Sequence, residues 1–323
     1  MRQSELYTKT VKNLPKDETA KNARWLIRAG YIYKDMAGAY AYLPLGLRVL
    51  KKIEQIIREE MNAIGGQELM MTALQNPEVW QATKRWDDKV VDIWFKTRGD
   101  SLGLAHTHEE PITKMMTHYI HSYKDLPTYV YQFQTKFRNE LRAKSGLLRV
   151  REFLMKDLYS FDADAAGLER FYQLCIQAYQ RIFKRVGLGS CTYLTFAGGG
   201  SFSKYSHEFQ TISDAGENIV LLDPQKKVAI NKEVYGSAVL KELKLKKNNL
   251  VEKKAIEVAN IFKLGTKFSI PLGLSYKDKR GQSKPVVMGS YGIGLGRLMA
   301  TVVEVLADSR GLVWPESIAP FKV

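Results

Sequence analysis

The stretch YVYQFQTKFRNELRAKSGLLRVREFLMKD, residues 129–157, decides the fold of this chain. Residues 129–138 predict a strand, because aromatic and mostly polar side chains alternate there between two faces. The aromatic face carries Tyr129, Tyr131, Phe133 and Phe137, and the other face carries Val130, Gln132, Gln134, Lys136 and Arg138. A polar face of this kind lies either in water or on the floor of a polar binding cleft, and the alternation does not choose between the two.

The rest of this stretch predicts a hairpin with a basic tip. Residues 136–157 contain seven Lys and Arg side chains, and Lys144-Ser145-Gly146 predicts the turn between two strands. Guanidinium groups bind phosphate with fork geometry, so the hairpin suits a nucleotide, an RNA end or both. The alternative is a surface hairpin whose cations pair with Glu140 and Glu152.

The flanking sequence mixes helices and strands. Helices are predicted over 46–63, 109–121, 166–186 and 296–307, strands over 258–269 and 284–290, and a loop followed by a strand over 192–214. Apolar stripes support two of the helices, with Leu47, Leu50, Ile53, Ile57 and Met61 on the first and Leu168, Phe171, Cys175, Ala178 and Ile182 on the third. Regular βαβ alternation is missing, which predicts an α+β fold with a largely antiparallel sheet.

Composition narrows the class of protein. The 323 residues carry a net charge of +15, and such an excess attracts polyanions, most commonly nucleic acid. The two cysteines match no zinc or CxxC spacing, which favours a reducing compartment. The sequence contains no run of about 18 apolar residues, so it does not predict a membrane span. The N-terminus lacks an apolar signal region, so a cytoplasmic location is expected, or an organellar matrix if a transit peptide has been removed.

Three further segments invite a functional interpretation. GSYGIGLGR, residues 289–297, opens a helix and ends in Arg297, which suits either phosphate binding or tight backbone packing. HTHEE, residues 106–110, lacks further ligands for a metal, so a glutamate that binds a substrate amine is the better functional hypothesis. The stretch 241–254 has six lysines and predicts either a solvated excursion or an RNA contact.

Taken together, the motifs resemble class II aminoacyl-tRNA synthetases, and among them the prolyl-tRNA synthetases of bacterial and mitochondrial type. The matching segments occur in family order over nearly the whole chain: LPLGLRVLKKIEQIIREEM, THEE, SYKDLP, YQFQTKFRNELR, REFLMKDLYSF, SHEFQ, IFKLGTKFS, MGSYGIGLGR and GLVWPESIAPF. The resemblance implies one catalytic domain over residues 1–323, an antiparallel sheet flanked by helices, and a homodimer. Motif 1 is assigned to 43–72, motif 2 to 137–157 and motif 3 to 289–306.

The resemblance also implies a reaction and its residues. Proline and ATP, which brings Mg²⁺, give prolyl-adenylate, and the prolyl group then passes to the acceptor end of tRNA(Pro). Both steps need alignment and charge neutralisation more than proton transfer. ATP contacts are implied for Arg138, Glu140, Arg149 and Arg297, with Arg138 and Arg297 catalytic; proline contacts for Thr107, Glu109, Arg138, Phe153, His207 and Ser290; and tRNA contacts for Arg142 and Lys144. No protein ligand is assigned to a metal.

The chain also departs from the family pattern. Substitutions fall at Thr72, His106, Ala197-Gly198, Phe202, Lys204 and Ser290. A short lysine-rich link at about 224–252 stands where an editing domain is inserted in bacterial enzymes, and the anticodon-binding domain that follows GLVWPESIAPF in the family is expected to be absent, either by truncation or in a natural short form. These departures keep two alternatives open, namely a paralogue that activates an amino acid without charging tRNA and a catalytically silent RNA-binding or regulatory protein.

Overall fold

A computed structural model describes residues 2–13, 16, 18–141, 143–200, 202 and 205–321. Nine strands form the main sheet: β3 Gln67–Glu68, β7 Thr128–Phe137, β8 Glu152–Asp162, β9 Thr192–Gly198, β10 Tyr205–Ile212, β11 Asn218–Asp223, β12 Val228–Asn231, β13 Val251–Gly265 and β16 Val287–Gly294. Their order is β10-β9-β12-β11-β13-β16-β8-β7-β3, and β10 also pairs with β13. Only the β12–β9 and β3–β7 pairs are parallel, which confirms the α+β prediction.

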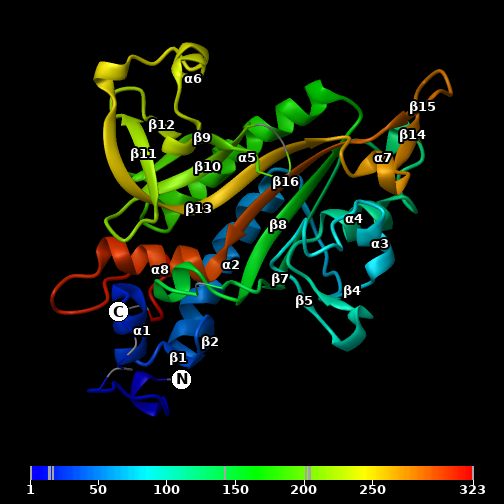
Figure 1. Cartoon of the computed structure of the whole chain (residues 1–323). Coiled ribbons are helices and arrows are strands. Elements are labelled where there is room, and N and C mark those ends of the chain that lie inside the picture. The colour runs from blue at the N-terminus through cyan, green and yellow to red at the C-terminus, as the bar shows by residue number, and fades with distance from the viewer. Residues whose placement is uncertain are drawn as a thin grey trace.

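The smaller elements surround this sheet (Figure 1). The short strands are β1 Ile32–Met36, β2 Ala39–Tyr42, β4 Leu74–Gln75, β5 Phe95–Lys96, β6 Gly103–Leu104, β14 Ser275–Lys277 and β15 Ser283–Pro285. The α-helices are α1 Lys21–Arg28, α2 Pro44–Ala63, α3 Pro77–Gln81, α4 Glu109–Met116, α5 Ala165–Arg185, α6 Ser237–Glu242, α7 Ser269–Leu272 and α8 Leu295–Leu306. The 3₁₀ turns are η1 Gln3–Glu5, η2 Arg98–Asp100, η3 Tyr123–Asp125, η4 Gly146–Leu148, η5 Lys232–Val234 and η6 Lys247–Asn249.

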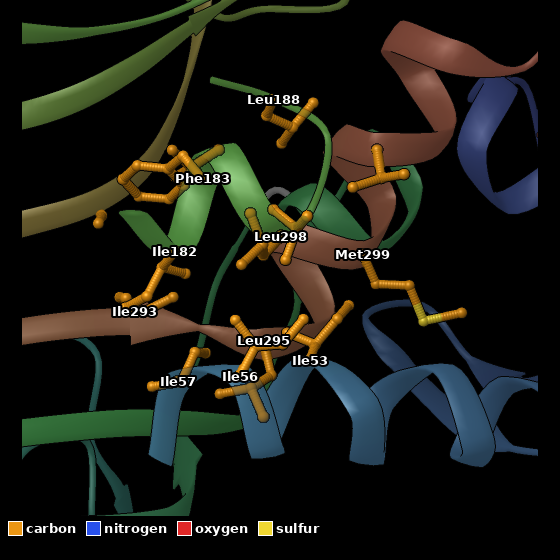
Figure 2. Packing of buried hydrophobic residues seen from close by; sticks show 14 of the residues in the cluster. Ile53, Ile56, Ile57, Ile182, Phe183, Leu188, Ile293, Leu295, Leu298 and Met299 are labelled. Carbon is orange, nitrogen blue, oxygen red and sulfur yellow. The ribbon is translucent and has the colours of Figure 1, made fainter. Parts of the chain in front are cut away.

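The main core lies between one face of the sheet and the helices α2, α5 and α8. Figure 2 shows side chains from all three helices packed against Ile293 of β16. The stripe predicted on α5 is buried throughout, as expected for a helix with one apolar face. The prediction for α2 is wrong at Leu47, which is 44% exposed, because the buried stripe runs through Leu45 and Val49 instead.

β7 and β8 form the predicted antiparallel hairpin, but a long loop rather than a tight turn links them. The turn does fall at Ser145 and Gly146, both with positive φ, but β7 has ended at Phe137 and β8 begins only at Glu152. Asn22 of α1 accepts a hydrogen bond from the backbone N–H of Leu147 at 3.0 Å. This contact holds η4 against α1 and α8, so Gly146, Leu147 and Leu148 are buried while Leu141 and Lys144 earlier in the loop stay exposed.

Other boundaries also differ from the sequence predictions. The helix at 109–121 stops at Met116, because the Asp125 carboxylate accepts hydrogen bonds from the backbone N–H groups of His121 and Ser122 and starts η3 instead. The expected loop after residue 192 begins with β9, whose partners β10 and β12 come later in the chain. The two predictions at 258–269 and 284–290 correspond to parts of β13, β15 and β16. Within the described ranges, no helix combines the length and apolarity that a bilayer crossing needs.

Candidate active site

A cavity of about 400 Å³ lies on the face of the sheet opposite the three core helices. The alternation of β8 defines the two sides, since Met155, Asp157 and Tyr159 line the cavity. Lys156 and Leu158 point the other way, where Lys156 bonds Tyr179 of α5 and Leu158 joins the main core. Of the two alternatives for the polar face of β7, the binding cleft therefore holds and water does not, since Lys136 on that face is fully buried below the cavity.

Two arginines approach the cavity from different elements. Arg138 follows β7, donates from Nε to the carbonyl oxygen of His106 at 3.3 Å, and lies with Cζ 5.2 Å above the Phe153 ring. Arg297 begins α8 and donates to the carbonyl oxygens of Leu148 at 2.9 Å and Glu257 at 3.2 Å. Burial, and then the charge of Arg297, lower the pKa of Arg138. In the described part of the chain both guanidiniums bond backbone carbonyls rather than carboxylates, so their charge is available to an anion.

Glycines of β16 leave room beside Arg297. A Cβ added to Gly292 or Gly294 would meet no atom nearer than 3.7 Å, so it would project into the cavity that both residues line. The absence of side chains at these positions lets a ligand reach the backbone. Of the two interpretations of the glycine-rich segment, ligand approach fits these two residues better than tight packing does.

A second pair of charged residues stands at the rim. Arg149 donates from Nε to Glu140 at 2.9 Å and from Nη1 to Glu217 at 3.4 Å. The Glu140 hydrogen bond raises the pKa of Arg149. This is the pairing with Glu140 that the sequence left open as an alternative, yet both Arg149 and Glu140 line the cavity.

At the deep end of the cavity, hydroxyl groups surround a buried carboxylate. Glu109 is 3% exposed, and its two oxygens accept hydrogen bonds from Thr107 Oγ1 and, at 3.0 Å, from Ser290 Oγ. The nearest cation in an ion pair is Arg85, with Nη1 4.0 Å from Glu109 Oε2. A carboxylate oriented by two hydroxyls and lining a cavity is suited to bind a cationic amine.

Below this carboxylate lies a buried polar network. Lys136 Nζ is 2.9 Å from Asp157 and 2.5 Å from Nδ1 of His108, while His108 Nε2 is 3.0 Å from the carbonyl oxygen of Thr72. Burial and then Lys136 lower the pKa of His108 to about 4, so the ring is neutral at pH 7. Because the ammonium donates to Nδ1, we assign the ring proton to Nε2, which donates to Thr72. Burial alone would raise the pKa of Asp157, but the Lys136 ammonium, helped by a hydrogen bond from Gln132, brings it below its usual value.

The two histidines of HTHEE have different surroundings. His106 packs between Trp80 and Trp94, with ring centroids 4.8 and 4.2 Å away. His108 contacts Lys136 instead. Among the residues that the structure describes, no group of three or more His, Cys, Asp or Glu is arranged to hold a metal ion.

Two of the predicted site residues that the structure describes, His207 and Lys144, do not line the cavity. His207 does not line it; its Nδ1 lies 2.9 Å from Tyr172 Oη, and its ring packs on Phe196. Its expected place in a proline pocket therefore has no contact to support it, because β10 lies across β13 from the cavity strand β16. Lys144 is exposed on the loop before η4 and also lies outside the lining. Arg142 and Lys204 fall outside the described residues.

The structure adds cavity residues that sequence reasoning missed, notably Arg85, Asp157, Tyr159 and Glu257. Asp157 stands in the quoted motif 2 segment, and its alternation with Met155 could have indicated it. Arg85 and Glu257 come from segments with no recognisable site pattern, so only the fold reveals them.

Comparisons with known proteins decide the family. A model of the tRNA synthetase class II core domain (G, H, P, S and T) matches residues 93–306. The proline–tRNA ligase of Anaplasma marginale is 39% identical over 341 residues, spanning 100% of this chain and 79% of the relative. The chain belongs to the prolyl-tRNA synthetase family. The family's proline–tRNA ligase from Rhodospirillum rubrum is 38% identical, again over 100% of the chain and 79% of its own length.

Solved prolyl-tRNA synthetases share the fold. One from Cryptosporidium parvum, complexed with halofuginone and AMPPNP, superimposes with a TM-score of 0.73 at 15% identity, over 93% of this chain and 56% of that one. One from Giardia lamblia, in complex with prolyl-adenylate, gives a TM-score of 0.70 at 20% identity, over 90% of this chain and 53% of that one. These likenesses confirm the class II catalytic fold that the motifs imply.

Proposed function

We propose that the cavity condenses L-proline with ATP and passes the prolyl group to tRNA(Pro). A carboxylate oxygen of proline attacks the α-phosphorus, the bond from that phosphorus to the bridging oxygen breaks, and pyrophosphate leaves. The terminal ribose hydroxyl of tRNA then attacks the acyl carbon, and AMP leaves with the electron pair. The observation that carries the proposal is the presence of Glu109 and Arg138 in one cavity, since proline needs an anion for its ammonium and a cation for its carboxylate.

The amino-acid end of the site centres on Glu109. The secondary ammonium of proline has two N–H groups, which can donate hydrogen bonds to Glu109 and to the hydroxyl oxygen of Thr107. Ser290 holds the second oxygen of Glu109 at 3.0 Å, and Phe153 forms an apolar wall under Arg138. The ring of proline is apolar, so it can pack on this wall while the fixed carboxylate binds the ammonium.

The nucleotide end centres on the arginines. We assign Arg138 to the α-phosphate and the proline carboxylate, and Arg297 to the γ-phosphate; both line the cavity together with Gly292 and Gly294, which supports this assignment. Both guanidiniums are fixed by backbone carbonyls before any ligand arrives, which reduces the reorganisation needed as charge develops. Glu140 is assigned to the adenine amine, and Arg149, which now pairs with it, to a further ATP contact.

ATP brings Mg²⁺, and one residue fits it. Glu257 is among the cavity residues and carries a carboxylate, the kind of oxygen ligand that Mg²⁺ prefers; Asn260 Nδ2 donates to it at 3.4 Å. Bound there, the ion would neutralise charge on the phosphates. Asn260 and Arg297, which bonds the backbone carbonyl of Glu257, keep this segment of β13 in place.

Assembly and location follow the family. The motif 1 region 43–72 exposes Leu47 and Met70, at 44% and 79%, which supports a homodimer through this surface. The bacterial sources of the relatives support a cytoplasmic location.

Proline-dependent exchange of pyrophosphate into ATP tests the proposal. We expect faster exchange with proline than with alanine or glycine at equal concentration, since a pocket excludes smaller side chains only weakly. Exchange without charging of tRNA(Pro) would instead favour the paralogue, and no exchange with any amino acid would favour the silent protein.

A further inference from the structure

Nine exposed lysines gather on one lobe of the molecule. The lobe comprises residues 224–254, running from the β11–β12 turn through η5, α6 and η6 into β13 (Figure 1, upper left). We call it the lysine lobe. Its lysines are Lys226, Lys227, Lys232, Lys241, Lys244, Lys246, Lys247, Lys253 and Lys254.

The lysine lobe is a folded surface rather than a loose link. Val239 and Leu245 are buried with Phe196 and Ile230 in a small core of their own, and Leu243 and Leu250, among others, pack against it. Lys226 Nζ donates to the carbonyl oxygen of Lys244, which joins the β11–β12 turn to the end of α6. The apolar residues thus face inward, and the lysines are carried outward on a fixed frame.

Little of this charge is neutralised within the lobe. Its three glutamates are Glu233, Glu242 and Glu252, so nine lysines leave six positive charges in excess. In the described part of the chain the lobe forms one ion pair, Lys232 with Glu252 at 3.0 Å. Glu233 accepts a hydrogen bond from the backbone N–H of Gly198 at 2.9 Å rather than pairing with a lysine of the lobe. Such a surface attracts a polyanion over a Debye length of about 8 Å at physiological salt.

The lobe is continuous with the active site. Glu233 and Val234 line a recess that shares Phe202, Asn260 and Phe262 with the main cavity. Lys253 and Glu257 lie four residues apart on β13, which pairs regularly with β11 and β10 over this stretch, so both side chains point to the same face. A strand rises about 3.3 Å per residue, which puts Lys253 about 13 Å from the cavity residue Glu257.

We propose that the lysine lobe binds the phosphates of the tRNA acceptor arm and leads its 3′ end past Gly198–Gly200 into the cavity. The inference rests on the proposed function, because only a chain that charges tRNA needs this path. Lysines act on RNA as point charges that set position rather than read sequence. RNA is favoured over an anionic membrane or an acidic protein because the basic surface adjoins the cavity that a tRNA terminus must enter.

A triple variant, Lys246→Ala with Lys247→Ala and Lys253→Ala, tests this path. Its matched control replaces three exposed lysines at the other end of the molecule, Lys114, Lys124 and Lys277. We expect filter binding to show a dissociation constant for tRNA(Pro) raised about tenfold by the lobe variant, and a salt slope smaller by about 3. The control should match the parent in both, and all three proteins should exchange pyrophosphate equally.

Other outcomes separate the two proposals. Unchanged tRNA affinity and salt slope in the lobe variant would overturn the tRNA path, even if the lobe proved to bind phosphatidylserine vesicles. An equal loss in the control would also overturn it, because the effect would then follow net charge alone. If the unmodified chain showed no proline-dependent pyrophosphate exchange, the proposed function itself would be overturned.

Discussion

Arg85 places Nη1 2.9 Å from Oε1 and 3.0 Å from Oε2 of Glu110 in the interior of the protein. The guanidinium is enclosed by the rings of Trp80, Phe202 and Phe268, with centroids 5.2 to 5.5 Å from Cζ. This pair adjoins the carboxylate of the amino-acid end of the cavity, so a structural ion pair borders the amine site.

Replacing Arg85 with Ala leaves the Glu110 carboxylate buried without its cationic partner, with the Thr83 hydroxyl still bonded to it at 2.9 Å. We expect the free energy of unfolding to fall by about 3–5 kcal/mol, measured by urea denaturation. The double replacement Arg85→Met with Glu110→Gln should recover most of that loss, because no charge is then left buried alone. A loss below about 1 kcal/mol in the single variant would show that the pair contributes little.

Arg297→Ala should lower the rate of proline-dependent pyrophosphate exchange by about 100-fold or more, because a preorganised cation on the triphosphate is lost. Circular dichroism should show the fold retained. Arg310→Ala is the matched control, since that side chain is 92% exposed just beyond α8. Normal exchange in Arg297→Ala would refute the placement of the γ-phosphate.

Ser290→Ala removes the hydroxyl that orients Glu109. One neutral-to-charged hydrogen bond contributes about 1.5–3 kcal/mol, so the KM for proline should rise about 10-fold or more while the KM for ATP stays the same. The control is Ser269→Ala, which removes a buried hydroxyl at the start of α7 that donates to the carbonyl oxygen of Thr266. Equal changes in both KM values would show that Ser290 acts on the whole site rather than on the amine.

The buried Lys156 should make the free energy of unfolding depend on pH. Burial lowers its pKa to about 7 in the folded protein, whereas a free lysine titrates near about 10.4. Between these values the unfolded chain binds the extra proton, so the free energy of unfolding should rise with pH from about 7 to 10 on this account. Lys156→Met should flatten that rise in urea titrations at pH 7 and pH 9. Parallel pH profiles for the two proteins would contradict the prediction.

Mischarged alanyl-tRNA(Pro) should persist in the presence of this chain. The alignment with the Anaplasma relative has 341 positions against 323 residues of this chain. The relative therefore has about 18 residues that this chain lacks, which is too few for a domain inserted within the aligned region. A pocket shaped for a larger apolar side chain excludes smaller ones weakly, so editing would need a second site. Clear hydrolysis above the uncatalysed rate in a deacylation assay would contradict this expectation.

Local pattern predicted the strand at 129–138 and the helices α2, α5 and α8, because period-2 and period-3.6 spacing are properties of the chain itself. The β7–β8 hairpin and its turn were predicted, but not the packing of the loop, because that depends on Asn22, more than 120 residues away in sequence. His207 was misplaced for a related reason: family order gives its strand but not the side to which its ring turns.

Sequence alone determined the family, the antiparallel sheet and the candidate residues Arg138, Arg297 and Glu109, since these depend on motif order and side-chain chemistry. Only the tertiary structure decided that the polar face of β7 underlies a cavity rather than meeting water, and that Arg85 borders that cavity. The tertiary structure also showed that the lysine-rich stretch 224–254 is a folded surface beside the cavity. The physical reason is that burial and charge pairing are set by neighbours distant in sequence, which no local spacing records.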